Sequence, residues 1–119
     1  MTKIVIIDDN EAILEAVKIA LDGFGYEVLT STKGEMFIPT IARIQPAVVL
    51  LDLLLSGEDG GEVAKALRKN NDTKNIPIIL ISADPSAEKI AKDSGIEGFL
   101  SKPFDLDRLL AVVDDCVCN

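Results

Sequence analysis

The chain has 119 residues, of which 48% are hydrophobic and 27% charged, a composition that supports one globular domain with a substantial core. Its 12 basic and 20 acidic residues give a formal net charge of −8, which argues against direct binding to nucleic acid or to an anionic membrane surface. The sequence contains no histidine, which excludes histidine-based nucleophile pairs and imidazole metal sites, so a metal ion would need oxygen ligands, as Mg2+ prefers, or the two cysteines.

Short β-branched runs alternate with segments of helical hydrophobic spacing along the chain. In chain order they predict strand 3–7, helix 11–22, strand 26–30, helix 34–44, strand 47–51, helix 61–69, strand 76–81, helix 86–94, strand 98–101 and helix 105–117. Asn10 is the expected N-cap of the first helix, and Gly23 is its expected C-terminal stop. Pro39 falls inside the second helical pattern. Because a proline removes a hydrogen bond and clashes with the preceding turn, we expect that helix to be kinked or to start late.

The five predicted strand–helix units indicate the fold class. Their strands read as nearly continuous apolar runs, which is typical of a parallel sheet covered by helices on both faces. The sequence contains neither a Pro- or Gly-rich linker nor an internal repeat. We therefore expect a single α/β domain over residues 1–119, with no room for a second one.

Polar side chains follow the predicted strands at their C-terminal ends. In chain order these are Asp8 and Asp9, then Asp52, Ser82 and Lys102. Because ligands of an open α/β sheet bind at that edge, we expect these side chains to converge. Asp52 interrupts the most apolar stretch, AVVLLDLLLS, and a carboxylate buried there needs a cation beside it. Lys102 and Mg2+ would supply the positive charge that clustered carboxylates require.

Each of these residues also has a purely structural interpretation. An Asp-Asp pair after a strand is often a solvated turn with a helix cap, a serine there is often a cap, and Lys-Pro is often a surface turn. Their occurrence at one edge, in the order Asp-Asp, Asp, Ser, Lys-Pro, is what indicates one shared site.

That order is carried by the segments IVIIDDN, VVLLDLLLSGEDGGEV, IPIILISAD and GFLSKPF, and it resembles the receiver domain of two-component response regulators. The resemblance covers the whole chain. It implies a flavodoxin-like three-layer α/β/α sandwich, with five parallel strands in the order 2-1-3-4-5 and five helices. Residues 1–119 would form this receiver domain.

The resemblance also implies roles for the residues at this edge. Asp52 would be the phosphoacceptor, and Lys102 would pair with the phosphoryl group. Mg2+ would be held by Asp9 directly and by Asp8 largely through water. The remaining ligands would be Asp52 and the backbone carbonyl of Leu54.

The implied function is a phosphorylation-dependent signalling switch. Asp52 would take a phosphoryl group from a sensor histidine kinase or a phosphotransfer protein, and the chain would catalyse only its own phosphorylation and dephosphorylation. Ser82 and Phe99 would form the switch pair. The peptide bond between Lys102 and Pro103 would be cis.

The implied output is a changed surface. Phosphorylation would repack the face formed by residues 86–94, 98–101 and 105–117, for recognition by a downstream target or effector domain, or for homodimerisation. The sequence leaves three contexts open: a stand-alone receiver, a relay that passes the phosphoryl group onward, and a piece of a longer protein.

The first apolar run and the cysteines bear on the location. Asp8 and Asp9 interrupt that run too early for a signal peptide. Cys116 and Cys118 are interpreted as free thiols near a helix end in a reducing compartment. We therefore expect a cytoplasmic protein without nucleic-acid or membrane partners.

The sequence leaves two other functions open, and it differs from the family pattern at one loop. A phosphatase of the haloacid dehalogenase type also uses an aspartyl phosphate and magnesium, but its nucleophile lies in an Asp-x-Asp motif after the first strand. A pseudo-receiver would bind partners without being phosphorylated, which the complete set of acidic, hydroxyl and lysine residues argues against. Where the family usually has Met-Pro, this chain has Leu55-Ser56, and we expect a looser loop there.

Overall fold

Strands and helices alternate along the chain much as the apolar patterns predict. The computed structural model describes residues 1–118, and side chains as far as Val117. Its elements are β1 (Lys3–Ile7), α1 (Glu11–Asp22), β2 (Glu27–Ser31), the 3-10 helix η1 (Glu35–Phe37), α2 (Ile38–Ile44), β3 (Val48–Asp52), β4 (Leu54–Leu55), β5 (Glu58–Asp59), α3 (Gly60–Lys69), β6 (Ile78–Ser82), α4 (Ala87–Asp93), β7 (Gly98–Ser101) and α5 (Leu106–Cys118).

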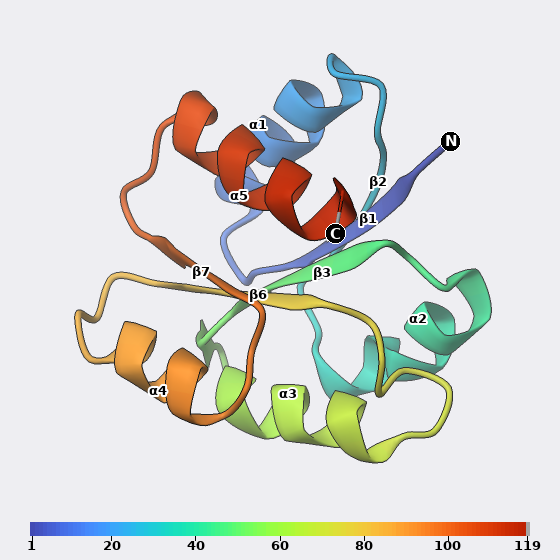
Figure 1. The fold of residues 1–119 in the computed structure, drawn as a ribbon, viewed down its shortest axis with the longest axis vertical. Coiled ribbons are helices and arrows are strands. Elements are labelled where there is room, and N and C mark those ends of the chain that lie inside the picture. Colours follow the sequence, from blue (N-terminus) through green and yellow to red (C-terminus); the bar gives the residue numbers. More distant parts are fainter. Residues whose placement is uncertain (119) are drawn as a thin grey trace.

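A parallel sheet forms the middle layer of the molecule. Its five strands lie in the order β2-β1-β3-β6-β7, so counted along the chain they have the predicted order 2-1-3-4-5. Figure 1 shows α1 and α5 on one face of this sheet and α2, α3 and α4 on the other. The predicted three-layer α/β/α sandwich is therefore confirmed. In the described part of the chain, no helix combines the length and the apolar character that a membrane crossing requires.

Two core clusters, one on each face of the sheet, explain the continuous apolar runs. Neighbouring residues of a strand point to opposite faces. On one side, α1 and α5 pack against Ile4, Ile6, Val48, Leu50, Ile79, Ile81 and Leu100. On the other side, α2, α3 and α4 pack against Val5, Ile7, Val49, Leu51, Ile78 and Leu80. Both faces are covered, so the buried positions of the three central strands are apolar from Ile4, Val48 and Ile78 until each strand ends.

The helix ends follow from local chemistry. The Asn10 side chain accepts hydrogen bonds from the backbone of Ala12 at 3.0 Å and of Ile13 at 3.2 Å, and Gly23 is the C-cap, as predicted. Pro39 lies in the first turn of α2, where its missing N–H has no intrahelical partner to lose. The single turn of 3-10 helix before it takes up the rest of the pattern, so the predicted late start is confirmed.

One element was not predicted. Residues 54–59, expected to be a loop, form a small antiparallel hairpin in which Leu54 pairs with Asp59 and Leu55 with Glu58. Gly57 has a positive φ of 76°, which permits the tight turn between β4 and β5. Strands of two residues are too short to give a periodic signal, which explains why the pattern missed them.

Gly60 sets how closely α3 approaches the end of β3. A Cβ atom placed at Gly60 would lie 2.7 Å from Leu53 Cα and would also clash with the backbone oxygen of Asp52. Because both neighbours are backbone atoms, neither can move aside without shifting the strand end. A glycine is therefore required at this position for close packing rather than for an unusual φ.

We predict that Gly60→Ala lowers the free energy of unfolding by about 2–3 kcal/mol, because the added methyl group overpacks a backbone contact. Urea unfolding monitored by circular dichroism measures this change. Gly61→Ala is the matched control, because its Cβ would meet only side-chain atoms, Asp59 Oδ1 at 3.1 Å and Leu53 Cδ1 at 3.8 Å. The control should stay within about 1 kcal/mol of wild type. Equal stability of the two variants would contradict the proposed steric role of Gly60.

Candidate functional site

The alternation of side chains along the strands brings three charged residues to one side of the sheet edge. Asp8, Asp52 and Lys102 each stand two positions beyond a strand residue that belongs to the cluster packed against α1 and α5, namely Ile6, Leu50 and Leu100. Side chains two positions apart share a face of the sheet. The parallel register of β1, β3, β6 and β7 then places the strand ends, and these side chains, at the same edge.

Lys102 lies between two buried carboxylates. Its Nζ is 3.0 Å from Asp52 Oδ2, to which it donates a hydrogen bond, and 3.0 Å from Asp8 Oδ2. Asp8 is completely buried, and Asp52 is only 4% exposed. The question posed by a carboxylate in the most apolar stretch is thus resolved, because Asp52 is buried and an ammonium group meets it.

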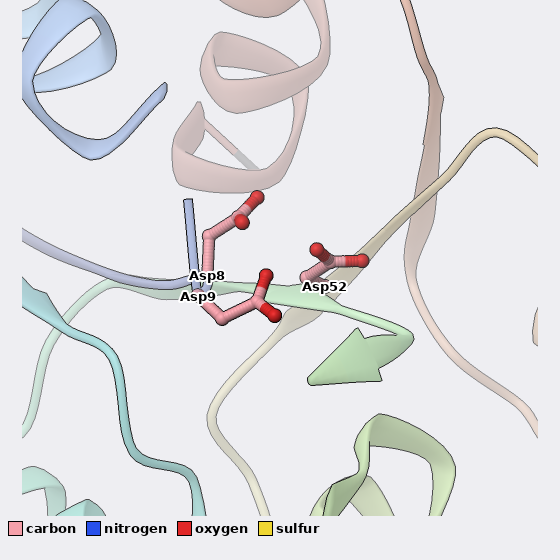
Figure 2. Close-up of side chains that lie close together, drawn as sticks. All are labelled: Asp8, Asp9 and Asp52. Carbon is pink, nitrogen blue, oxygen red and sulfur yellow. The ribbon is translucent and has the colours of Figure 1, made fainter. Parts of the chain in front are cut away.

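The three carboxylates form one compact acidic cluster. One oxygen from each of Asp8, Asp9 and Asp52 lies within 4.8 Å of the others, and Figure 2 shows the side chains converging beyond the ends of β1 and β3. Asp9 differs from the other two, because it is exposed and its Oδ2 accepts a 2.6 Å hydrogen bond from Ser56 Oγ. The cluster therefore combines two buried carboxylates with one that faces solvent.

The surroundings of each group change its pKa. Burial raises the pKa of Asp8, and repulsion from Asp52 acts in the same direction. The hydrogen bond from Ser56 lowers the pKa of Asp9. Burial by itself would lower the pKa of Lys102, but contacts with Asp52 and Asp8 outweigh it, so the pKa of Lys102 lies above its ordinary value. At neutral pH the lysine is charged, and the ionised form of Asp8 is held at an energetic cost.

This donor set fits a hard divalent cation. Carboxylate oxygens are the ligands that Mg2+ prefers, and Mg2+ sites commonly use one or two carboxylates together with water. Asp8 Oδ2 is buried and lies 3.0 Å from Lys102 Nζ, an ammonium group that Asp8 shares with Asp52. A buried carboxylate oxygen that shares one ammonium group with a second carboxylate is a position where a further cation would be stabilising.

The hydroxyl and aromatic residues of the predicted switch lie on β6 and β7, the two strands that follow β3 across the sheet. Ser82 ends β6 and is buried, and its Oγ accepts a 3.0 Å hydrogen bond from the backbone N–H of Asp84. Phe99 is half-buried and packs against the cluster that α3 and α4 cover. Leu80 pairs with Phe99 in the register of β6 and β7, so Ser82 lies two positions beyond the neighbour of Phe99 on the same face.

Two further features concern the loops around the cluster. The Lys102–Pro103 peptide bond is cis, as predicted, and the backbone N–H of Lys102 donates to the Ser82 carbonyl at 2.9 Å. The backbone N–H of Leu54 donates to Asp52 Oδ1 at 3.1 Å, while the Leu54 side chain is 72% exposed. The structure thus brings Leu54 next to Asp52. Its carbonyl as a metal ligand stays a prediction.

Sequence reasoning missed the contribution of the hairpin. Ser56 was identified only as a replacement for the usual proline, yet its hydroxyl contacts Asp9 directly. Glu58 accepts hydrogen bonds from the backbone of Gly34 at 2.8 Å and of Glu35 at 2.9 Å, which ties the hairpin to the loop after β2. The signal that could have indicated Ser56 is its place four residues after Asp52, on the same loop.

The cysteine at the end of α5 shows no sign of an activated thiol. Cys116 is a half-buried free cysteine that packs against the α1–α5 core cluster. Burial raises the pKa of this thiol, and the nearby Asp115 and Glu97 act in the same direction. The side chain of Cys118 lies outside the described part of the chain.

Comparisons with known proteins identify the family. Residues 4–114 match the response regulator receiver domain. The chain is 37% identical over 115 residues to the DNA-binding dual master transcriptional regulator RpaA of Synechocystis, a match that covers 95% of this chain and 48% of that protein. The chain spans about half the length of the first curated relatives that it matches.

Solved structures agree with this assignment. A putative response regulator from Chloroflexus aurantiacus superposes with a TM-score of 0.91 at 30% identity, covering 99% of this chain and 98% of that one. The receiver domain of the sensor histidine kinase PA1611 from Pseudomonas aeruginosa has a TM-score of 0.89 at 21% identity, with 99% and 98% coverage, and it holds a magnesium ion in its active-site cleft.

These findings support the receiver interpretation and give no support to the phosphatase alternative. Receiver domains of response regulators are signalling modules rather than classical enzymes, they bind Mg2+ at an acidic pocket, and response regulators interact with histidine kinases. This chain has a cluster of three aspartates at the corresponding edge of its sheet. The chain belongs to the response regulator receiver domain family, whose members are phosphorylation-dependent signalling switches.

Proposed function

We propose that Asp52 accepts a phosphoryl group from a phosphohistidine of a sensor kinase or a phosphotransfer protein, and that the aspartyl phosphate is the signal. One observation carries this proposal: the Asp52 carboxylate ends a core strand and already has the Lys102 ammonium 3.0 Å away. A dianion formed on Asp52 would therefore arise beside a fixed positive charge. No rearrangement of the backbone would be needed to place that charge.

The transfer itself requires little covalent chemistry from the protein. An oxygen of Asp52 attacks phosphorus, the P–N bond to the histidine breaks, and the electron pair of that bond stays on the histidine nitrogen. Catalysis is mainly positioning and neutralisation of charge on the phosphoryl oxygens. Lys102 would turn from its ion pair with Asp52 toward one of these oxygens.

Mg2+ would be held by Asp9 and Asp52, by Asp8 largely through water, and by the backbone carbonyl of Leu54. When bound, the ion would neutralise charge on the phosphoryl oxygens. Two observations support this assignment: the donors are carboxylate oxygens that lie within 4.8 Å of one another, and three carboxylates share one ammonium group. Asp8 would then be stabilised as a carboxylate, which burial alone disfavours.

Ser82 and Phe99 would convert the phosphoryl group into a changed surface. The Ser82 hydroxyl accepts one hydrogen bond but has no acceptor for its proton among the described residues, so it can donate to a phosphoryl oxygen. A shift of Ser82 would open space beside Leu80, next to which Phe99 lies in register. The face formed by α4, β7 and α5 would then present a different surface to a target protein, an effector domain or a second copy of the chain.

Residues 1–119 would act as one receiver domain. It would be phosphorylated in the cytoplasm, where the phosphohistidine of a kinase would be accessible. The chain would catalyse only its own phosphorylation and dephosphorylation. It would bind neither nucleic acid nor membrane itself, in keeping with its net charge of −8.

We predict that Asp52→Asn abolishes phosphorylation, because the amide removes the nucleophilic carboxylate while it preserves the shape of the side chain. The measurement is intact mass after incubation with acetyl phosphate and Mg2+, where wild type should gain one phosphoryl group. Chelation of Mg2+ should also prevent the gain. Asp84→Asn is the control at the same edge, because the Asp84 carboxylate is exposed and hydrogen-bonded to Ser86. A stable phosphoryl group on the Asp52→Asn protein would contradict the assignment, and an unmodified wild type would favour a pseudo-receiver.

We predict that Asp8→Asn increases the free energy of unfolding at neutral pH when Mg2+ is absent. The pKa of Asp8 is raised by folding, so its contribution to stability is present below the ordinary carboxyl pKa and is lost as pH rises through the folded value. Urea unfolding in chelator from about pH 4, which is close to the ordinary aspartate pKa of 3.8, to about pH 8 should show the variant gaining stability relative to wild type as pH rises.

The Asp8→Asn variant should gain less stability than wild type when Mg2+ is added, because a neutral amide replaces one of the charged carboxylates that attract the ion. Asp72→Asn, in an exposed turn, is the control and should follow wild type in both respects. A stability difference that does not change with pH would argue against burial of an ionised Asp8 as the cause.

We predict that Leu54→Asn shortens the lifetime of the phosphorylated form several-fold, on the order of 1 kcal/mol in barrier height. Leu54 is 72% exposed and its backbone bonds to Asp52, so its side chain can shield the path of an attacking water, whereas asparagine can hold that water. The decay is measured after removal of the phosphodonor. Ile19→Asn changes another exposed aliphatic residue, on α1, and should leave the lifetime unchanged. An equal or longer lifetime for Leu54→Asn would refute the shielding role.

A further inference from the structure

Ser56 stands at the tip of the β4–β5 hairpin, facing the acidic cluster. Its Oγ donates a 2.6 Å hydrogen bond to Asp9 Oδ2 across 47 positions of sequence. This is the one hydrogen bond that the Asp9 side chain makes with another described side chain. Asp8 and Asp52 are held by burial and by Lys102, whereas Asp9 is exposed, and the Ser56 hydroxyl is its strongest hydrogen-bond partner, with backbone N–H groups adding to it.

The hairpin that carries Ser56 is itself anchored on its other side. Glu58 accepts hydrogen bonds from the backbone N–H groups of Gly34 and Glu35, and Leu55 is buried at 7% exposure. The backbone N–H of Gly60 donates to the Leu53 carbonyl at 2.8 Å, which closes the base of the hairpin. Ser56 is therefore presented to Asp9 by a hairpin that hydrogen bonds anchor at its base and on its other side, while the looser loop expected from the missing proline stays a prediction.

The turn would also accept the proline that Ser56 replaces. Among the described residues, Gln45 is the only residue other than glycine with a positive φ, so Ser56 has a negative φ and Gly57 a positive one of 76°. Negative followed by positive φ matches a type II turn, whose first central position favours proline. Stiffness of the loop and the presence of the hydroxyl can thus be separated by mutation.

We propose that Ser56 is a positioning residue for metal binding: its hydroxyl fixes the Asp9 carboxylate in the orientation that receives Mg2+. The inference rests on the magnesium site proposed above. The Ser56 hydroxyl donates its hydrogen bond to Asp9 Oδ2, which leaves Asp9 Oδ1 available to the cation. Hydrogen bonds to metal-binding carboxylates orient the ligand before the ion arrives, and their loss typically weakens metal binding about 10- to 100-fold.

The experiment is a titration of the whole chain with MgCl2, followed by amide shifts in two-dimensional NMR spectra and by calorimetry, in the absence of any phosphodonor. Ser56→Ala removes the hydroxyl and should raise the Mg2+ dissociation constant about tenfold. Ser56→Thr keeps the hydroxyl and should stay within about twofold of wild type, since it can form the same bond. Ser94→Ala, an exposed serine at the end of α4, is the matched control and should be unchanged.

Ser56→Pro is the decisive variant. If the role of Ser56 were only to stiffen the turn, proline would preserve Mg2+ affinity, and that outcome would overturn the proposal. Positioning by the hydroxyl predicts instead that Ser56→Pro binds Mg2+ as weakly as Ser56→Ala. Equal or tighter binding by Ser56→Ala would also overturn it, because the hydroxyl would then be irrelevant to the ion or would compete with it. Wild type that binds no Mg2+ at all would refute the metal site itself, and with it this inference.

Discussion

The position of the Lys102 ammonium group between Asp8 and Asp52 is the constraint on which the rest of the site depends. Two buried carboxylates that share one lysine repel each other, and neither is stable as an anion in a protein core without a cation beside it. The lysine lies 3.0 Å from an oxygen of each. One positive charge among three clustered carboxylates leaves the site with net negative charge, which favours a divalent cation there.

The layered fold is what places these three charged residues at one edge of the sheet. Strands β1, β3 and β7 deliver Asp8, Asp52 and Lys102 to one edge because each follows a core residue of the same face by two positions. Apolar packing on both faces holds the strand ends rigidly, and Gly60 allows α3 to begin directly against the end of β3. The packed strands thus place the charges, while the loop beyond β3 carries Leu54 and Ser56.

This chain differs from the usual family pattern in the loop that follows the acceptor. Leu55-Ser56 stands where the family usually has Met-Pro, and the residue before it, Leu54, is an exposed leucine. Leu54 and Ser56 affect different atoms of the site, since Leu54 adjoins Asp52 and Ser56 contacts Asp9. The hairpin formed by β4 and β5 connects both residues, so metal binding and protection of the acyl phosphate are expected to depend on one small element.

The sequence by itself determined the strands, the helices and the identity of the charged residues at the sheet edge. Continuous apolar runs are unambiguous when both faces of a sheet are buried, and Asn10 and Pro39 set helix starts through local hydrogen bonding and sterics alone. Strand order and the residue roles came from resemblance rather than from the pattern. Tertiary structure decided which oxygen of which carboxylate meets Lys102, that Asp8 is completely buried while Asp9 is exposed, and that Ser56 contacts Asp9. Those contacts depend on how the ends of separate strands pack against a hairpin whose strands have only two residues each. No local periodicity encodes a contact between positions 47 residues apart, such as that between Asp9 and Ser56.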